Sequence, residues 1–401
     1  MTEGQPKTPG LGPVLLTVLL DLLGFGLVIP LLSFYAEDFG ATELQVTLLM
    51  AVYSIAQFVM APFWGSLSDR VGRRPVMLMS VGMTALMLLA FGLSNQLWML
   101  FLFRTLHGAA AANISTAQAY VADVTTPENR ARGMGLIGAS FGVGFTLGPW
   151  MGGELSHFGY QAPIFLAAAL SAVNFVWVLL RLPESRPPDT AADGTPHAHR
   201  RTLDPRALVD GLRHPVVGLC IALTFVAVFS FAMMEGTFAL VAEHRWGMGA
   251  AQVGRVFGLI GIIGIVIQGG LIGRLTKRFG EPLLVGIGYA LNAAGLAILA
   301  VSMGGASMWA ACTLLAIGSS LANPSLQSLI SKAASAEDQG AVLGVNQSFS
   351  ALARATAPQT GGLLYTRWFD GGAMAVGALL MGTALLLSIP ATRRARAAVT
   401  G

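Results

Sequence analysis

Charged side chains are scarce in this sequence. Asp, Glu, Lys and Arg together make up 11% of its 401 residues, whereas 54% of the residues are hydrophobic. The mean hydropathy of +0.66 lies well outside the range of soluble domains. These values exclude a soluble enzyme or binding domain and indicate a membrane protein.

Cysteine is almost absent, since the chain contains only Cys220 and Cys312. Both lie within long apolar runs, where no oxidising compartment is available, so we expect small packing residues and no disulfide. The sequence also lacks a nucleophile–base pair and a set of residues spaced as metal ligands. We therefore expect neither an enzyme nor a bound metal or cofactor.

Apolar runs recur along the whole chain, and a spanning helix needs about 20 mostly apolar residues. We predict an all-α polytopic membrane protein with 12 transmembrane helices. The predicted spans cover residues 12–36, 46–67, 76–94, 97–122, 134–155, 162–182, 216–242, 253–273, 283–303, 307–331, 341–364 and 372–390.

The net charge of +4 and the pI near 9.3 would fit a nucleic-acid-binding protein, but the positions of the basic residues do not. With twelve spans and both termini on one side, 19 of the 24 Lys and Arg residues fall on that side, three fall opposite and two lie inside spans. This asymmetry follows the positive-inside rule. We therefore expect a monomeric, multi-pass protein of the cytoplasmic membrane, with both termini in the cytoplasm and no nucleic-acid partner.

The second part of the chain repeats the first at one constant offset. Two sets of six spans in the same order indicate two halves related by an axis along the membrane normal, which transporters use for alternating access. We assign residues 1–182 to the first half, 183–215 to a cytoplasmic linker and 216–401 to the second half. The matching positions are Gln118, Glu128, Gly135, Pro149, Gly152 and Gly153 in the first half and Gln327, Glu337, Gly344, Pro358, Gly361 and Gly362 in the second.

Four ionisable side chains interrupt predicted spans: Asp21, Arg104, Glu235 and Arg354. Each costs about 2.5–3.5 kcal/mol at membrane depth, which makes each a candidate functional residue. Apolar surroundings favour a neutral carboxyl group and a nearby arginine favours the carboxylate, so a carboxyl group between both can load and release a proton. We predict that Asp21 is the leading proton carrier, that Glu235 is a second carrier or meets a cationic substrate, and that the arginines pair with them or meet an anionic substrate. Static ion pairs that fix the helix packing are the alternative.

Uncharged polar side chains accompany these charges within the spans. They are candidates for lining a substrate cavity, although an interhelical hydrogen bond explains any single one equally well. His107 lies one turn from Arg104 on the same helix and is also a candidate relay. The predicted cavity set comprises Gln57, His107, Asn113, Gln118, Asn292, Asn323 and Gln327.

Three motifs follow one another in the first half: GSLSDRVGRRP (65–75), FRTLHGAAAA (103–112) and GASFGVGFTLGPWMGG (138–153). In this order they resemble the major facilitator superfamily, and most closely its twelve-span drug–proton antiporters of the tetracycline-efflux type. Arg104 matches the arginine of that family's fourth-span motif. The resemblance implies a major facilitator fold with two pseudo-symmetric six-helix halves, and proton-coupled export of small compounds.

Two positions depart from the tetracycline exporters that the chain resembles. Those exporters carry an acidic residue in the third span, where this chain has Ala85, and another in the ninth, where it has Asn292. Asparagine keeps the hydrogen bonds of aspartate but cannot titrate. The departures argue against a tetracycline–metal chelate as substrate and leave the export of other drugs or of metabolites open.

The motif at 65–75 has a counterpart at 273–282, GRLTKRFGEP, in which Lys277 stands where the first half has Asp69. The resemblance implies a cytoplasmic gate between the halves, with Gly65 and Gly72 allowing close approach. We expect Arg73 to meet Asp123 and Asp69 to meet Arg130 or Arg132; a plain topology signal would explain the arginines but not Asp69. The predicted gate comprises Gly65, Asp69, Arg70, Gly72, Arg73, Arg74, Asp123 and Arg130.

The fifth predicted span carries small residues four apart, which let two helices approach closely. They are Gly144, Gly148 and Gly152, and Pro149 interrupts the run. The resemblance assigns this stretch to the motif of antiporters. We expect a closely packed helix at an interface that moves.

Three functions are compatible with the sequence. The first is proton-coupled efflux of small amphipathic compounds or drugs by alternating access, driven by the proton gradient. The second is a proton-coupled or facilitative transporter of a metabolite, such as an organic anion. The third, a non-transporting membrane receptor, is disfavoured by the internal repeat and by the paired charges within the membrane.

Overall fold

The structure, a computed structural model, describes residues 11–111, 113–125, 127–185, 215–333 and 339–400. Within these ranges the chain folds into helices and contains no strand, which confirms the predicted all-α class. The middle of the linker, residues 186–214, falls outside these ranges.

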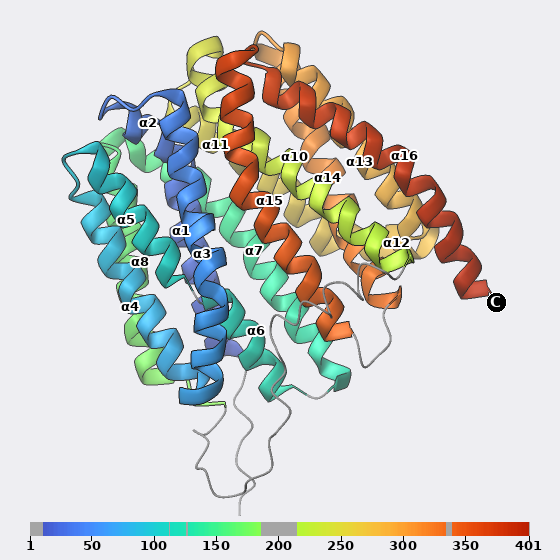
Figure 1. Ribbon diagram of the computed structural model, residues 1–401, viewed down its shortest axis with the longest axis horizontal. Coiled ribbons are helices and arrows are strands. Elements are labelled where there is room, and N and C mark those ends of the chain that lie inside the picture. Colours follow the sequence, from blue (N-terminus) through green and yellow to red (C-terminus); the bar gives the residue numbers. More distant parts are fainter. Residues whose placement is uncertain (1–10, 112, 126, 186–214, 334–338, 401) are drawn as a thin grey trace, which may run out of the picture.

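The helices follow one another with short connections (Figure 1). Those of the first half are α1 (Gly12–Val28), η1 (Ile29–Leu31), α2 (Leu32–Glu37), α3 (Glu43–Val71), α4 (Arg73–Gly92), α5 (Leu97–Ala110), α6 (Asn113–Val124), α7 (Pro127–Leu155), η2 (Ser156–Phe158) and α8 (Gln161–Arg181). Those of the second half are α10 (Pro215–Trp246), α11 (Ala250–Val266), the π-helical turn η3 (Ile267–Leu271), α12 (Ile272–Phe279), α13 (Glu281–Val301), α14 (Gly305–Ala333), α15 (Gln339–Arg367) and α16 (Gly372–Thr400).

Eight helical stretches in the described part of the chain are long and apolar enough to cross a membrane by length and composition. The fourth predicted span, residues 97–122, is instead divided into α5 and α6. The fifth, eleventh and twelfth predicted spans are occupied by α7, α15 and α16. Helices therefore occupy all twelve predicted spans. For the fourth, fifth, eleventh and twelfth spans, a membrane crossing stays a prediction.

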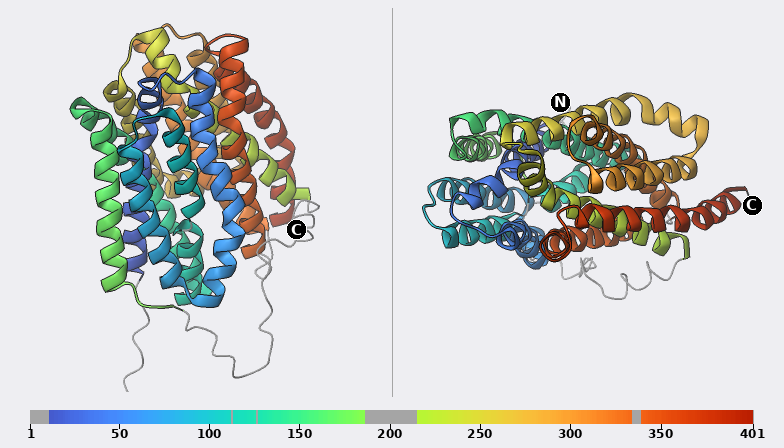
Figure 2. Two further views of the ribbon diagram at one scale, coloured as in Figure 1. Left: turned by 60° about the vertical axis from the view of Figure 1, so that its left-hand side comes forward. Right: turned by 90° about the horizontal axis from the view of Figure 1, so that it is seen from above.

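The helices gather into two groups that lie side by side when the molecule is seen from above (Figure 2). One group holds α1–α8 and the other α10–α16. We call the end of the bundle that carries Arg73 and the last turn of α8 the linker end. The opposite end carries the connection from Glu37 to Glu43, and we call it the far end.

Residues at its two ends explain where α3 begins and why the chain turns into α4 after it. Thr42 begins α3 with a capping box, in which its hydroxyl accepts from the Gln45 N–H and its own N–H donates to Gln45 Oε1 at 2.9 Å. The helix ends at Gly72, whose φ of +99° is accessible to glycine at little cost. Gly280, at the matching position of the repeat, has φ +77° between α12 and α13, so the structure repeats this turn in the second half.

The two halves touch through two pairs of long helices, α7 with α11 and α3 with α15. Glycines allow the approach: a Cβ at Gly254 would lie 2.5 Å from the Pro149 carbonyl oxygen, and one at Gly153 would lie 2.9 Å from the Gly254 Cα. A Cβ at Gly362 of α15 would likewise collide with Thr47 of α3. All these contacts lie in the far-end portions of the helices, so the far end is closed.

Candidate functional site

Asp21 lies in the middle of α1 and is partly buried. The Asn113 side chain at the start of α6 donates a hydrogen bond to it, with Nδ2 2.9 Å from Asp21 Oδ1. Among the described residues, no basic nitrogen lies within 4.0 Å of its carboxylate. The predicted proton carrier therefore contacts a neutral amide in this state.

Arg104 of α5 is 4% exposed and contacts aromatic rings. Its guanidinium carbon lies 4.6 Å from the centre of the Tyr53 ring and 5.6 Å from that of Phe25, a cation–π arrangement. The His107 ring stands edge-on to the Tyr53 ring, with 5.0 Å between the ring centres. The Arg104 Nε and Nη1 atoms are buried and have no hydrogen-bond partner among the described residues. The sequence pointed to the arginine but gave no sign that Tyr53 would be its neighbour.

Glu235 of α10 and Arg354 of α15 supply the charges of the second half. Glu235 is partly buried, and the Arg354 side chain is exposed in the isolated protein. The Arg354 charge acts on Glu235 and also reaches Tyr53 in the first half. No ion pair within 4.0 Å joins Glu235 to Arg354 in the described part of the chain. Tyr53 thus lies between the charged groups of both halves.

The residues predicted for the substrate cavity occupy different surroundings. Gln57 donates to the Ala111 carbonyl at 3.4 Å, and Gln118 is partly buried on α6. Asn323 and Gln327 are exposed one helical turn apart on α14. Asn292 is 3% exposed between α13 and α14, where it accepts from the Ser319 hydroxyl at 3.2 Å. A role in substrate binding stays a prediction for all of them.

At the linker end, Arg73 is the centre of a polar network and is 6% exposed. Its Nε lies 3.0 Å from Asp123 Oδ2, and its Nη1 lies 2.7 Å from Asp69 Oδ1 and also donates to Ser68. The predicted contact of Arg73 with Asp123 is therefore present. The Arg130 and Arg132 side chains lie outside the described residues, so their contact with Asp69 stays a prediction.

Glu184, which the sequence did not single out, closes this network. Its two carboxylate oxygens accept the backbone N–H groups of Arg73 (2.8 Å) and Arg74 (3.1 Å), the first residues of α4. A carboxylate is favoured at a helix N-terminus. Gly72 makes room, because a Cβ there would lie 2.5 Å from Glu184 Oε2, whereas nothing lies within 4 Å of a Cβ at Gly65. Only Gly72, of the two glycines expected at a close contact, is at one in this state.

Asp69→Asn is expected to slow transport while substrate binding stays largely intact, because Arg73 loses a charged partner and the linker end changes its packing. Initial transport rates and equilibrium substrate binding to the purified protein measure the two effects. Arg274→Gln, which alters an exposed charge of the counterpart motif at 273–282, is the control. Loss of binding in the Asp69 variant would contradict a role in the gate.

The small residues of α7 pack against two helices, α1 on one face and α11 on another. Gly144, Gly148 and Gly152 face α1: a Cβ at Gly152 would lie 2.2 Å from the Leu27 carbonyl oxygen. Gly153 faces α11 of the second half, as does the Pro149 carbonyl. The predicted close packing is therefore present, and the helix lies both within the first half and at its contact with the second.

Polar groups of both halves meet at the far end. Arg255 of α11 binds Glu154 of α7 through Nε at 2.6 Å and Nη2 at 3.2 Å. One ligand atom each of Glu37, Glu243 and His244 lie within 4.8 Å of one another, and His244 Nδ1 lies 2.7 Å from Tyr365 Oη. These contacts join α2 and α7 of the first half to α10 and α11 of the second.

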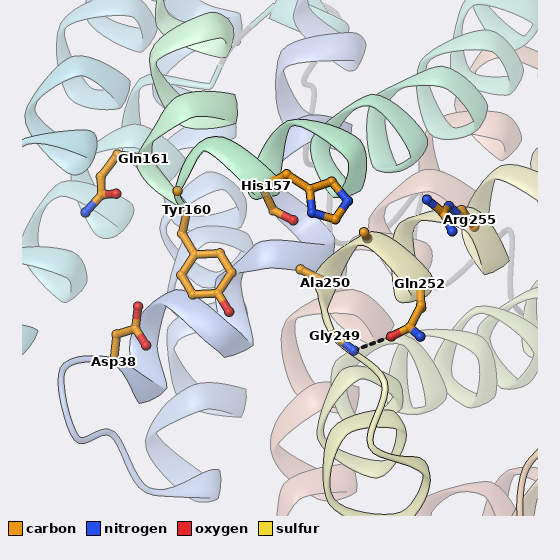
Figure 3. A pocket seen from close by; sticks show the side chains of 11 residues that line it. Asp38, His157, Tyr160, Gln161, Gly249, Ala250, Gln252 and Arg255 are labelled. Carbon is orange, nitrogen blue, oxygen red and sulfur yellow. Dashed lines mark hydrogen bonds between the residues drawn. The ribbon is translucent and has the colours of Figure 1, made fainter.

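A cavity of about 700 Å³ lies beside these contacts (Figure 3). Figure 3 shows Asp38 and Tyr160 of the first half on one side and the start of α11 on the other, where Gln252 accepts the Gly249 N–H at 2.7 Å. Burial raises the pKa of Asp38, and the nearby Glu243 carboxylate raises it further. Both halves thus form the walls of this cavity.

A second ion pair fixes the far end of the second half. Arg245 binds both oxygens of Asp370 and also donates to the carbonyls of Ala300 (2.9 Å) and Ser302 (3.1 Å). Asp370 lies in the connection between α15 and α16. The hydrogen bonds to Arg245 lower the pKa of the Asp370 carboxyl. The pair therefore holds together three connections that follow different helices.

Asp370→Asn is expected to lower the thermal unfolding temperature at neutral pH by a few degrees, because it leaves Arg245 without its carboxylate. The folded-state pKa of Asp370 is lowered, so the stabilisation is complete above the ordinary Asp pKa of about 3.9 and is lost as the pH falls through the folded value. The difference from the wild type should vanish in acid, as thermal scans over a pH series will show. Glu154→Gln, in an exposed pair, should change little; an equal effect of Asp370→Asn at every pH would contradict the assignment.

The family model described as the Major Facilitator Superfamily matches residues 14–358 of this chain. The tetracycline resistance protein, class C, of Escherichia coli is 32% identical over 395 residues, which cover 95% of this chain and 96% of that protein. Multidrug resistance protein 2 of Bacillus subtilis (strain 168) is 28% identical over 373 residues, 91% of this chain and 92% of that one.

Solved structures show the same fold. The human organic anion transporter MFSD10 (TETRAN) superposes with a TM-score of 0.73 at 25% identity, covering 96% of this chain and all of that one. A bacterial homologue of the human lysosomal transporter Spinster, in an inward-facing and unoccupied conformation, superposes with a TM-score of 0.75 at 14% identity over 96% of both chains.

Proposed function

Because the chain belongs to the major facilitator superfamily, we propose that it exports small amphipathic compounds in exchange for protons. It is a membrane transporter of small molecules and not an enzyme. Its similarity to tetracycline and multidrug resistance proteins supports export as the direction of transport. Ala85 and Asn292, in place of acidic residues, argue for a substrate other than a tetracycline–metal chelate.

Alternating access is the proposed mechanism. The halves touch only near the far end in the contacts described above, and the linker end carries most of the basic residues, which supports a cytoplasmic location for it. In this proposal the far end is closed towards the outside while the linker end admits substrate from the cytoplasm. The proton gradient then drives the exchange, and the protein works as a monomer without a bound cofactor.

The observation that carries the proton-coupled mechanism is the surroundings of Asp21. This carboxyl group lies deep in α1 with a neutral amide as its hydrogen-bond partner and no basic nitrogen within 4.0 Å among the described residues. It therefore has no permanent counter-charge that would keep it ionised. A carboxyl group in such surroundings can exist in both forms, which a proton carrier requires.

A second function, the transport of organic anions, is favoured by Arg104. Two of its nitrogen atoms are buried and find no hydrogen-bond partner in the described part of the chain, and an anionic substrate would satisfy them. The similarity to the human organic anion transporter supports the same reading. In this case the substrate carries the negative charge that the site lacks.

A pH-sensitive dye in inverted membrane vesicles tests the two functions. Vesicles with a preset proton gradient are challenged with a panel of cationic, neutral and anionic amphipathic compounds. Release of protons with cationic or neutral compounds supports drug–proton antiport. Flux of anionic compounds without proton release favours the second function, and no response in vesicles with verified protein would contradict both.

A further inference from the structure

The fourth predicted span, residues 97–122, is divided into two helices. The helix α5 ends at Ala110, Ala111 leaves the helical conformation with φ −75° and ψ +78°, and α6 begins at Asn113. Such a division removes helical partners from the last carbonyls of α5 and the first N–H groups of α6. Each unpaired group costs several kcal/mol in an apolar medium, so a division is stable only when other groups pair with them.

Side chains of two neighbouring helices pair with the freed carbonyls of α5. Trp64 of α3 donates to the Ala109 oxygen at 2.6 Å, Ser80 of α4 to the Ala110 oxygen at 2.5 Å, and Gln57 of α3 to the Ala111 oxygen at 3.4 Å. Three consecutive carbonyls thus each receive a donor from outside the span. The division is therefore encoded by the packing of α3 and α4 and is not a local distortion.

The other side of the division faces Asp21. Asn113, which is 2% exposed, opens the twelve-residue helix α6 and donates to Asp21 Oδ1 at 2.9 Å. The N-terminus of a helix favours a negative charge, and an amide N–H favours it further. The Asn113 Oδ1 atom is buried and has no hydrogen-bond partner within the described ranges. The Asn113 amide N–H thus already donates to Asp21, while its Oδ1 remains available as an acceptor.

Few other ionisable groups face Asp21 from the elements packed against it. Tyr53 of α3 and, around it, Arg104 and His107 of α5 are the nearest, and Arg354 of the second half reaches Tyr53. The remaining ionisable residues of α6, α7 and α8 are Tyr120, about two turns after Asn113 on α6, and a set near helix ends, namely Asp123, Glu128, Arg130, Arg132, Glu154 and Arg181. The hydrogen bond from Asn113 is thus the only direct one to the Asp21 carboxylate in the described part of the chain.

We propose that Asn113, placed by the divided span, is the positioning residue that serves both forms of Asp21. When Asp21 is ionised, the Asn113 amide N–H stabilises the carboxylate. When Asp21 takes up a proton from water, the amide group turns and Oδ1 accepts the new O–H; no covalent bond of Asn113 changes. Both forms then keep a hydrogen bond, and the proton leaves to water on the other side. This inference rests on the proposed role of Asp21 as proton carrier.

Asn113→Leu, which removes donor and acceptor at nearly constant volume, tests the proposal. The pH at half-maximal transport should rise by about one unit. Both forms of Asp21 lose a hydrogen bond, but the carboxylate loses the stronger, charge-assisted one while the apolar surroundings remain. Infrared difference spectra of the carboxyl C=O stretch over a pH series follow Asp21 directly, with Asp21→Asn identifying its band. A wild-type profile in a folded Asn113→Leu protein would overturn the proposal.

Two further variants separate this role from a structural one. Asn113→Ser keeps a donor and an acceptor at this position, so its profile should return towards that of the wild type. Asn174→Leu is the matched control: Asn174 is equally buried and also bonds α1, but to the Thr17 carbonyl at 3.1 Å. It should lower stability without moving the pH profile; an equal shift in both leucine variants would overturn the proposal.

The outcomes distinguish this inference from the proposed function. If Asp21→Asn retains proton coupling, the proposed role of Asp21 as proton carrier is wrong and the inference falls with it. If Asp21→Asn loses coupling but Asn113→Leu keeps the wild-type profile, only the inference is wrong. Should Asn113→Leu not fold, Asn113→Ala carries the same expectation in both assays.

Discussion

Asp21→Asn is expected to reduce compound-dependent proton flux in proteoliposomes to the level of empty vesicles. Asparagine keeps the size and hydrogen-bonding capacity of aspartate but cannot bind or release a proton at physiological pH. Asn113 would still contact the new side chain, so the local packing should survive. A pH-sensitive dye on one side of the membrane measures the proton flux, and a labelled compound on the other side measures the compound flux.

A gradient-free exchange assay serves as the control for this variant. Asp21→Asn should still exchange labelled for unlabelled compound, because alternating access does not require the proton once the substrate balances both sides. Glu235→Gln is the matched variant in the second half. Unchanged proton flux in Asp21→Asn together with its loss in Glu235→Gln would move the carrier to the second half and contradict our assignment.

Gly254→Val is expected to abolish most transport, because the new side chain collides with α7 where the two halves meet at the far end. The added Cβ would lie 2.5 Å from the Pro149 carbonyl oxygen and 2.8 Å from the Gly153 Cα, both backbone atoms that cannot turn away. Overpacking costs about 1–3 kcal/mol. Only the state with a closed far end bears this cost. The ratio of the population with an open far end to that with a closed far end therefore rises by about 5- to 150-fold.

A thiol probe reports this shift without any transport assay. Ala251→Cys places a cysteine in the closed contact of α11, where Ala251 is 9% exposed, and a membrane-impermeant maleimide should label it faster when Gly254→Val is also present. Gly249→Ala is the control, since a Cβ there meets only Gln252, at 3.9 Å. Equal labelling in all variants would show that the α7–α11 contact does not govern closure.

Much of the fold was predictable because apolar length is a local property. Helices occupy every predicted span, and the repeat of the motif at 65–75 returns as the matching turns at Gly72 and Gly280. The division of the fourth span was not predictable. The run GAAAAN (108–113) consists mostly of alanine, the strongest helix former, and what ends α5 is a set of donors on other helices, such as Trp64 and Ser80.

The candidate site was predictable in its charges but not in their partners. Asp21 and Arg104 stand out because an ionisable residue in a span is expensive, and Arg73 was expected to meet Asp123, as it does. The structure places Asn113 on Asp21 and Tyr53 on Arg104 instead of joining the two charges. These choices depend on how helices far apart in the sequence rotate against one another, which no local pattern records.

The cavity of about 700 Å³ at the far end has a consequence for inhibition. Its walls come from both halves, Tyr160 on one side and Gln252 on the other, so they separate when the far end opens. A compound that fills it adds its binding free energy to one state alone, about 2.7 kcal/mol at 100 times its Kd. Such a compound is expected to arrest the cycle without competing with substrate, and from the side opposite the linker it reaches its site without crossing the membrane.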